Sequence, residues 1–247
     1  MLPYGQMSLW GIFLCPKWFE ILNLGSNFNI YSLSLPFIIP RIRSINRIGP
    51  HNYDILSILI GSLLGEGYAE RHGNGTRFCF QQEHSNNPYL LWFHNYLSNL
   101  GYCTRNIPII TTRLGSGGKL RYISRFKTYT FVSFNWIHSD FYKKGIKVIP
   151  LDIGNYLSPL ALAIWIMDYE GKVSSGLKLA TNSFSKREVE YLAILLRNKY
   201  GLKVSVISAG KINQYNLYFS KSTMKILTQI VKPYLHPTMY YKFNGYL

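Results

Sequence analysis

The sequence predicts an α+β protein made of two similar units, each running helix, strand, strand, helix, strand, strand, helix. Two strongly apolar helical segments each end at an acidic residue, Glu66 in the first and Asp168 in the second. The same order of strand and helix signals follows each acid, and the acids lie about 100 residues apart, which is typical of an internal repeat. Such a repeat predicts pseudo-twofold symmetry, with the two apolar helices paired centrally and antiparallel sheets forming a saddle.

In the first unit, hydrophobic periodicity and turn residues define the predicted elements. Residues 55–65 form the apolar helix, and the Asn74-Gly75 turn precedes a strand over 77–83. Asn87-Pro88 opens an amphipathic helix over 89–100 that Gly101 stops. The remaining predicted elements are a hairpin of residues 109–114 and 120–130, a helix over 131–142, and a closing segment at 147–150.

The second unit repeats this order. The apolar helix covers residues 156–168, and 176–182 is predicted to be a strand. Ser185 caps the next helix, and Glu188 completes a capping box three residues later. A hairpin of 203–208 and 215–220 and a helix over 222–231 follow. The predicted organisation is therefore an irregular leader over 1–51, a first unit over 52–154 and a second unit over 155–247, with an added strand or helix as the alternative for the leader.

The charge of the chain indicates a polyanionic partner. Its 27 Lys and Arg residues outnumber 11 Asp and Glu residues, which gives a net charge of +16. Tyrosines and phenylalanines interleave with the cations, as suits a nucleic-acid surface, although a solvated basic face over an aromatic core is the alternative. Three unpaired cysteines and scattered histidines exclude a disulfide framework and a zinc site. We expect no membrane span, because no apolar run reaches 18 residues.

Four stretches, in order along the chain, carry a family resemblance: 61–70 (GSLLGEGYAE), 162–168 (LAIWIMD) followed by Gly171-Lys172, 177–182 (LKLATN) and 231–242 (VKPYLHPTMYYK). They resemble the single-chain LAGLIDADG homing endonucleases and intron maturases over residues 52–245. The resemblance implies a monomer that binds double-stranded DNA at an intron insertion site, and in some members the protein's own intron RNA. Residues 2–11 are similar to a piece of mitochondrial cytochrome b, which implies an organelle-encoded product of the mitochondrial matrix.

The resemblance also implies a metal site. In the family the acidic ends of the paired helices hold Mg²⁺ over the scissile phosphates, and we expect Mn²⁺ to substitute. Glu66 matches the first ligand. A gapless match places Tyr169 at the second ligand position, and a neutral phenol is a poor Mg²⁺ ligand. Either Asp168 or Glu170 therefore supplies the second carboxylate, or the second metal position is damaged. Gly61 and Gly65 in the first apolar helix are spaced for close approach of the two helices. The second helix offers only Ala161 and Ala163 for this contact, so the crossing cannot be perfectly symmetric.

Further site residues follow from the resemblance and from residue type. Lys147 and Lys242 match lysines that polarise the site, with generic phosphate clamping as the alternative. Gln82 and Asn182 resemble residues that position water or phosphate. Arginine, lysine and glutamine side chains on the predicted strands suit contacts with bases or phosphates. The candidates for DNA contact are Arg77, Gln81, Arg113, Arg121, Arg125, Lys127, Lys172, Lys178, Lys203 and Gln214.

The predicted function is a site-specific, Mg²⁺-dependent DNA endonuclease of intron homing. The alternative is a non-cleaving RNA-binding maturase that assists splicing of its own intron. The retained Glu66, Lys147 and Lys242 favour the first, and Tyr169 favours the second. A decayed reading frame with neither activity is a third interpretation.

Overall fold

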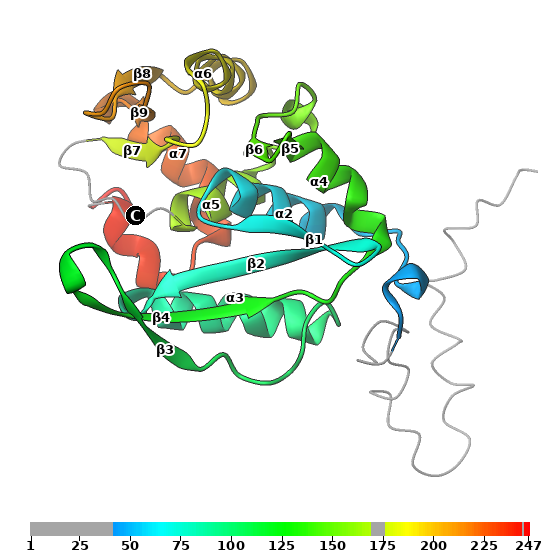
Figure 1. The fold of residues 1–247 in the computed structure, drawn as a ribbon. Coiled ribbons are helices and arrows are strands. Elements are labelled where there is room, and N and C mark those ends of the chain that lie inside the picture. Colours follow the sequence, from blue (N-terminus) through cyan, green and yellow to red (C-terminus); the bar gives the residue numbers. More distant parts are fainter. Residues whose placement is uncertain (1–41, 169–175, 244) are drawn as a thin grey trace, which may run out of the picture. The chain divides into compact units, whose positions relative to one another are not determined.

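The first unit is a four-stranded antiparallel sheet with helices packed around it. In the computed structural model, which describes residues 42–168, 176–243 and 245–247, all described residues belong to one unit of the chain, Leu35–Leu247. The sheet has the strand order β1-β2-β4-β3, and α3 packs along β2 and β4 on one side of it (Figure 1). The elements in chain order are α2 (Tyr53–Leu64), β1 (Tyr68–His72), β2 (Gly75–Glu83), α3 (Asn87–Asn99), β3 (Ile110–Leu114), β4 (Leu120–Lys127), α4 (Asn135–Phe141), β5 (Tyr142–Lys143) and β6 (Ile146–Lys147).

The second unit repeats the arrangement with a three-stranded antiparallel sheet of order β7-β9-β8. In sheet order its strands β7, β9 and β8 correspond to β2, β4 and β3 of the first unit, and residues 169–175 lie outside the described residues. Mixed helices and antiparallel sheets confirm the predicted α+β class. The elements are α5 (Pro159–Asp168), β7 (Leu177–Ala180), α6 (Lys186–Tyr200), β8 (Val204–Ser208), β9 (Tyr215–Phe219), α7 (Met224–Val231) and the 3-10 segments η10 (Lys232–Tyr234) and η11 (Pro237–Phe243).

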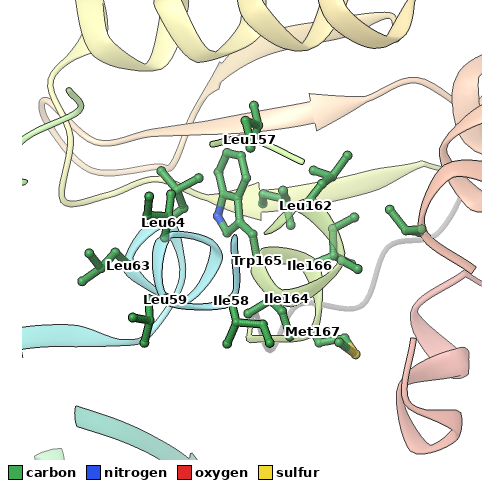
Figure 2. Packing of buried hydrophobic residues seen from close by; sticks show 14 of the residues in the cluster. Ile58, Leu59, Leu63, Leu64, Leu157, Leu162, Ile164, Trp165, Ile166 and Met167 are labelled. Atoms are coloured by element: carbon green, nitrogen blue, oxygen red, sulfur yellow. The ribbon is translucent and has the colours of Figure 1, made fainter. Parts of the chain in front are cut away.

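The helices α2 and α5 pack side by side (Figure 1). Asn52 starts α2 by accepting a hydrogen bond from the Ile55 backbone N–H at 2.8 Å, and Ser158 caps α5 through the Ala161 N–H at 3.0 Å. Both helices are apolar almost all round, as buried helices are. Figure 2 shows the Trp165 ring beside Leu64 in this core.

Glycine permits the close approach of the two helices. A Cβ at Gly61 would lie 2.4 Å from the Ala161 carbonyl oxygen, and a Cβ at Gly65 would lie 2.7 Å from the Asp168 Cβ. Both distances are shorter than real contacts allow, so the expected role of Gly61 and Gly65 is confirmed.

Most element boundaries agree with the prediction to within a few residues, and the differences include a later start of several helices and the unpredicted short strands β5 and β6. The helix predicted over 131–142 begins only at Asn135, because a 3-10 turn over Val132–Phe134 precedes it. The 3-10 segment Pro237–Phe243 was not predicted. The capping interaction of Ser185 and Glu188 is present, with the Ser185 N–H donating to the Glu188 carboxylate at 2.8 Å. None of the helices in the described part of the chain has the length and apolar character that a membrane crossing requires.

Candidate nucleic-acid interface and metal position

One face of the first sheet carries polar and basic side chains. Residues opposite one another on paired strands share a face, and alternate residues along a strand do too. The register pairs Gln81 with Arg125 and Arg113 with Arg121, while Lys127 pairs with Cys79, two residues from Arg77. Six predicted DNA contacts therefore lie together, and we call them the basic face: Arg77, Gln81, Arg113, Arg121, Arg125 and Lys127.

The opposite face of this sheet is the core side. Phe78, Phe80 and Phe126 are buried there, and the Phe80 ring contacts Phe93 of α3 with ring centroids 4.7 Å apart. Because α3 covers this side, the basic face is the side of the sheet left for a ligand. The six residues predicted from the sequence thus lie on one surface of the sheet.

The second unit contributes fewer of the predicted contacts. Lys178 lies in β7 opposite Tyr218, on the less buried face of that sheet. Lys203 is exposed immediately before β8, and Gln214 is half-buried before β9. Lys172 lies outside the described residues.

Glu66 follows α2 by two residues and is exposed. It lines a cavity of about 390 Å³ together with Gln81, Arg113 and Arg121. It also lines a second cavity of about 370 Å³, whose lining includes Lys147 and Asn182. Glu66 therefore lies where the basic face of the first unit meets the end of β7 in the second.

Lys147 is held beside this carboxylate. Its Nζ donates to the backbone carbonyl of Gly67 at 2.9 Å. Burial lowers the pKa of Lys147 to about 8, against the opposing effect of the Asp168 and Glu66 carboxylates. The ammonium thus lies close to the segment that carries Glu66 and supplies positive charge to the second cavity.

Gln82 and Asn182, the two predicted positioning residues, have different surroundings. Asn182 is exposed after β7 and lines the second cavity. Gln82 is 4% exposed, and its side-chain oxygen accepts a hydrogen bond from the Asn86 amide at 3.2 Å. Its side chain lies on the core side of β2, although the residue borders the first cavity. The structure brings Asn182, but not the Gln82 side chain, to the open part of the site.

Asp168 faces the protein interior. Its carboxylate is 3% exposed and accepts hydrogen bonds from the Ser62 hydroxyl and the Tyr89 hydroxyl, both at 2.8 Å. Burial raises the pKa of Asp168 to about 7. Asp168 therefore ties α5 to α2 and α3, and its metal role stays a prediction. Neither partner was identified from the sequence. A polar residue within an apolar helix is the only local signal for Ser62, and no local signal points to Tyr89.

Lys242 is also internal. It is 2% exposed, and its Nζ donates to the carbonyls of Ile166 at 3.0 Å and Met167 at 2.7 Å. These carbonyls belong to the last turn of α5 that the structure describes, and they satisfy the buried ammonium as hydrogen-bond acceptors. In this position Lys242 ties η11 to α5, and its predicted action on phosphates stays a prediction.

The described residues fit a divalent cation held jointly with a phosphate. They contain no cluster of three or more His, Cys, Asp or Glu side chains that would hold a metal by protein alone. Mg²⁺, however, is bound by one or two carboxylates together with substrate phosphates and water. An exposed Glu66 carboxylate beside an open cavity suits this mode of binding. Glu170, the other candidate ligand, lies outside the described residues.

The chain is similar in sequence to two maturases and an intron-encoded endonuclease. The chain is 51% identical over 211 residues to the cytochrome b mRNA maturase bI2 of Saccharomyces cerevisiae, covering 82% of this chain and 50% of that protein. It is 47% identical over 205 residues to the maturase of the same name from Debaryomyces hansenii, covering 82% and 78%. It is 40% identical over 155 residues to the intron-encoded endonuclease ai4 of Dictyostelium discoideum, covering 61% and 98%. The chain thus spans half the length of the Saccharomyces relative.

The fold has a solved counterpart. The structure of the homing endonuclease I-WcaI bound to its DNA recognition sequence superposes with a TM-score of 0.69 at 24% identity, covering 91% of this chain and 96% of that one. This likeness shows a shared fold. The family described as LAGLIDADG DNA endonuclease matches residues 56–227, most of the described chain. The chain belongs to the LAGLIDADG DNA endonuclease family.

Proposed function

We propose that the chain is a site-specific double-stranded DNA endonuclease of intron homing, acting by Mg²⁺-dependent phosphodiester hydrolysis. One observation carries the proposal: the exposed Glu66 carboxylate lies at the meeting point of two cavities, one bordered by the basic face. A duplex lying on the basic face would bring its phosphates toward this carboxylate. The family and the fold support the same conclusion.

The chemistry divides between the ion and the chain. When bound, Mg²⁺ supplies a water of lowered pKa and charge stabilisation for the leaving oxygen. Glu66 would hold the ion through its carboxylate, and the hydrogen bond from Lys147 to the Gly67 carbonyl fixes the segment on which Glu66 lies. The Lys147 ammonium offsets phosphate charge brought into the second cavity, and the exposed Asn182 amide can hold a water or a phosphate oxygen there.

The test is a cleavage assay on supercoiled plasmid carrying the intronless cytochrome b exon junction. Wild-type protein with Mg²⁺ should cut, and Glu66→Gln should lose cleavage while keeping DNA affinity, because it removes a metal ligand and no phosphate contact. Glu190→Gln on α6, which removes the same charge from an exposed Lys186 pair, is the matched control. If Tyr169 leaves the second metal position poor, nicked plasmid should accumulate before linear plasmid. Cleavage by Glu66→Gln at the wild-type rate would refute the role of Glu66.

A second candidate function is an RNA-binding maturase of a mitochondrial cytochrome b intron. The names of two relatives at 51% and 47% identity favour it, and so does the engagement of Asp168 in internal hydrogen bonds. A splicing assay with precursor RNA separates the candidates. Maturase activity should survive Glu66→Gln, because RNA binding needs no metal at Glu66. For either activity we propose a monomer acting in the mitochondrial matrix.

A further inference from the structure

An acidic residue, Glu70, lies at the β1 edge of the basic face, and a second acid on this face, Glu83, pairs with Arg121. Glu70 lies in β1 directly opposite Arg77 of β2, so the two side chains share that face. The Arg77 Nε donates to the Glu70 Oε1 at 2.5 Å, and the Lys127 Nζ donates to the same oxygen at 2.9 Å. Both cations therefore converge on one carboxylate oxygen, while Oε2 receives neither of these bonds.

Stability alone does not account for this carboxylate. The three side chains are 26% to 37% exposed, and partly exposed ion pairs contribute little to the stability of a fold. A carboxylate on a phosphate-binding surface also repels the polyanion and occupies two cations that could contact phosphates. The chain has only 11 acidic residues against 27 basic ones, so a negative charge at this position is a departure from its overall composition. Such a charge weakens indiscriminate binding, which is one way to gain specificity.

The charge stays on the carboxylate. Hydrogen bonding to Lys127 and, after the opposing effect of burial, to Arg77 lowers the pKa of Glu70 to about 2. At neutral pH the cluster is thus one negative group flanked by two positive ones. Its hydrogen-bonding capacity is an acceptor beside two donors.

A C·G base pair presents the complementary pattern in the major groove. Cytosine offers its N4 amino group as a donor, and the paired guanine offers O6 and N7 as acceptors. Carboxylates accept from cytosine N4, and arginine or lysine donates to guanine. An adenine also offers an amino donor, N6, but it sets its N7 acceptor beside the carboxylate, and its thymine partner presents the single acceptor O4 to the cation where guanine presents O6 and N7.

We propose that Glu70 determines sequence specificity: it keeps Arg77 and Lys127 from purely phosphate contacts and, with them, reads one C·G base pair in the major groove. This inference rests on the proposed binding of duplex DNA to the basic face. Glu70 accepts from the cytosine amino group through Oε2, and one of the two cations donates to the guanine of the same pair. The carboxylate takes no part in cleavage.

The test selects binding sites from a library of randomised DNA duplexes with three proteins: wild type, Glu70→Gln and Glu190→Gln. The wild-type motif should contain a C·G position with roughly five-fold or greater preference, the range expected of one good base contact. Glu70→Gln should lose that preference and keep the others, because a carboxamide both donates and accepts. Its affinity for unrelated duplex should rise severalfold, since two cations are released. The control, which makes the same charge change away from the sheet, should leave the motif unchanged.

Each outcome of this experiment either supports or overturns the inference. An unchanged motif in Glu70→Gln overturns the inference and leaves duplex binding standing, and so does a uniform loss of preference at every position. A wild-type protein that enriches no sequence refutes the proposed DNA function together with the inference. If Glu70→Gln fails to fold, Glu70→Asp decides: it keeps the charge but shortens the reach, so the C·G preference should fall in a folded protein, and an unchanged motif overturns the inference.

Discussion

The close contact between α2 and α5 predicts that a Gly→Ala substitution destabilises the protein, which is the opposite of its usual effect inside a helix. Gly→Ala inside a helix normally stabilises a protein by about 1 kcal/mol through helix propensity. At Gly61 the new Cβ would lie 2.4 Å from the Ala161 carbonyl oxygen and 3.0 Å from the Ala161 Cα. Both are backbone atoms, so no side chain can rotate away and the helices must separate by about 1 Å to restore van der Waals contact. Overpacking costs about 1–3 kcal/mol, and contact with rigid backbone places Gly61 in the upper part of this range. After the propensity gain of about 1 kcal/mol, we expect Gly61→Ala to be about 1–2 kcal/mol less stable than wild type.

Urea unfolding followed by circular dichroism measures the effect. Gly154→Ala is the matched control, because its Cβ would meet only the flexible Leu195 side chain, at 3.4 Å. We expect the control to remain within about 0.5 kcal/mol of wild type. A Gly61→Ala protein as stable as wild type, or more stable, would refute the packing of α2 against α5 described here.

Three further predictions concern charge and buried polar groups. Duplex affinity should fall steeply with salt, with a log–log slope of magnitude about 3 or more measured by fluorescence anisotropy, and a flat plot would contradict the role of the basic face. Burial lowers the pKa of His51 to about 4. Between about pH 6.5 and 4 the imidazole is therefore protonated in the unfolded chain and neutral in the folded chain. Stability should therefore fall by up to about 3 kcal/mol as pH falls through this window, and His51→Gln should flatten the profile in pH-dependent unfolding. Tyr89→Phe removes a hydrogen bond to Asp168 and should cost about 1–3 kcal/mol in urea unfolding, whereas an unchanged midpoint would show that the bond contributes nothing.

Local patterns in the sequence predicted the features that depend on neighbouring residues. The two apolar helices, the Ser185–Glu188 cap and the alternation that gathers the basic face all follow from spacing of a few residues. The inward orientation of Asp168 depends on Ser62 and Tyr89, which are distant in sequence, and on helix packing that no local pattern records. The pairing of Glu70 with Lys127 was missed for the same reason, because those residues meet only through the strand order β1-β2-β4.

In both units a lysine ammonium binds backbone carbonyls next to the acid, but the two carboxylates have different surroundings. Lys147 binds the Gly67 carbonyl just after Glu66, and Lys242 binds the Ile166 and Met167 carbonyls just before Asp168. A carboxylate near a helix C-terminus opposes the helix dipole, so a cation at each end offsets that cost. In the first unit the chain leaves the helix before its acid, and Glu66 points to solvent and the cavities. In the second the acid, Asp168, lies within α5 as far as the described residues run, and its buried carboxylate is bonded to Ser62 and Tyr89. The described residues thus place an open carboxylate in the first unit and an internally hydrogen-bonded one in the second, so Glu66 is the better placed of the two to meet a phosphate-bound ion.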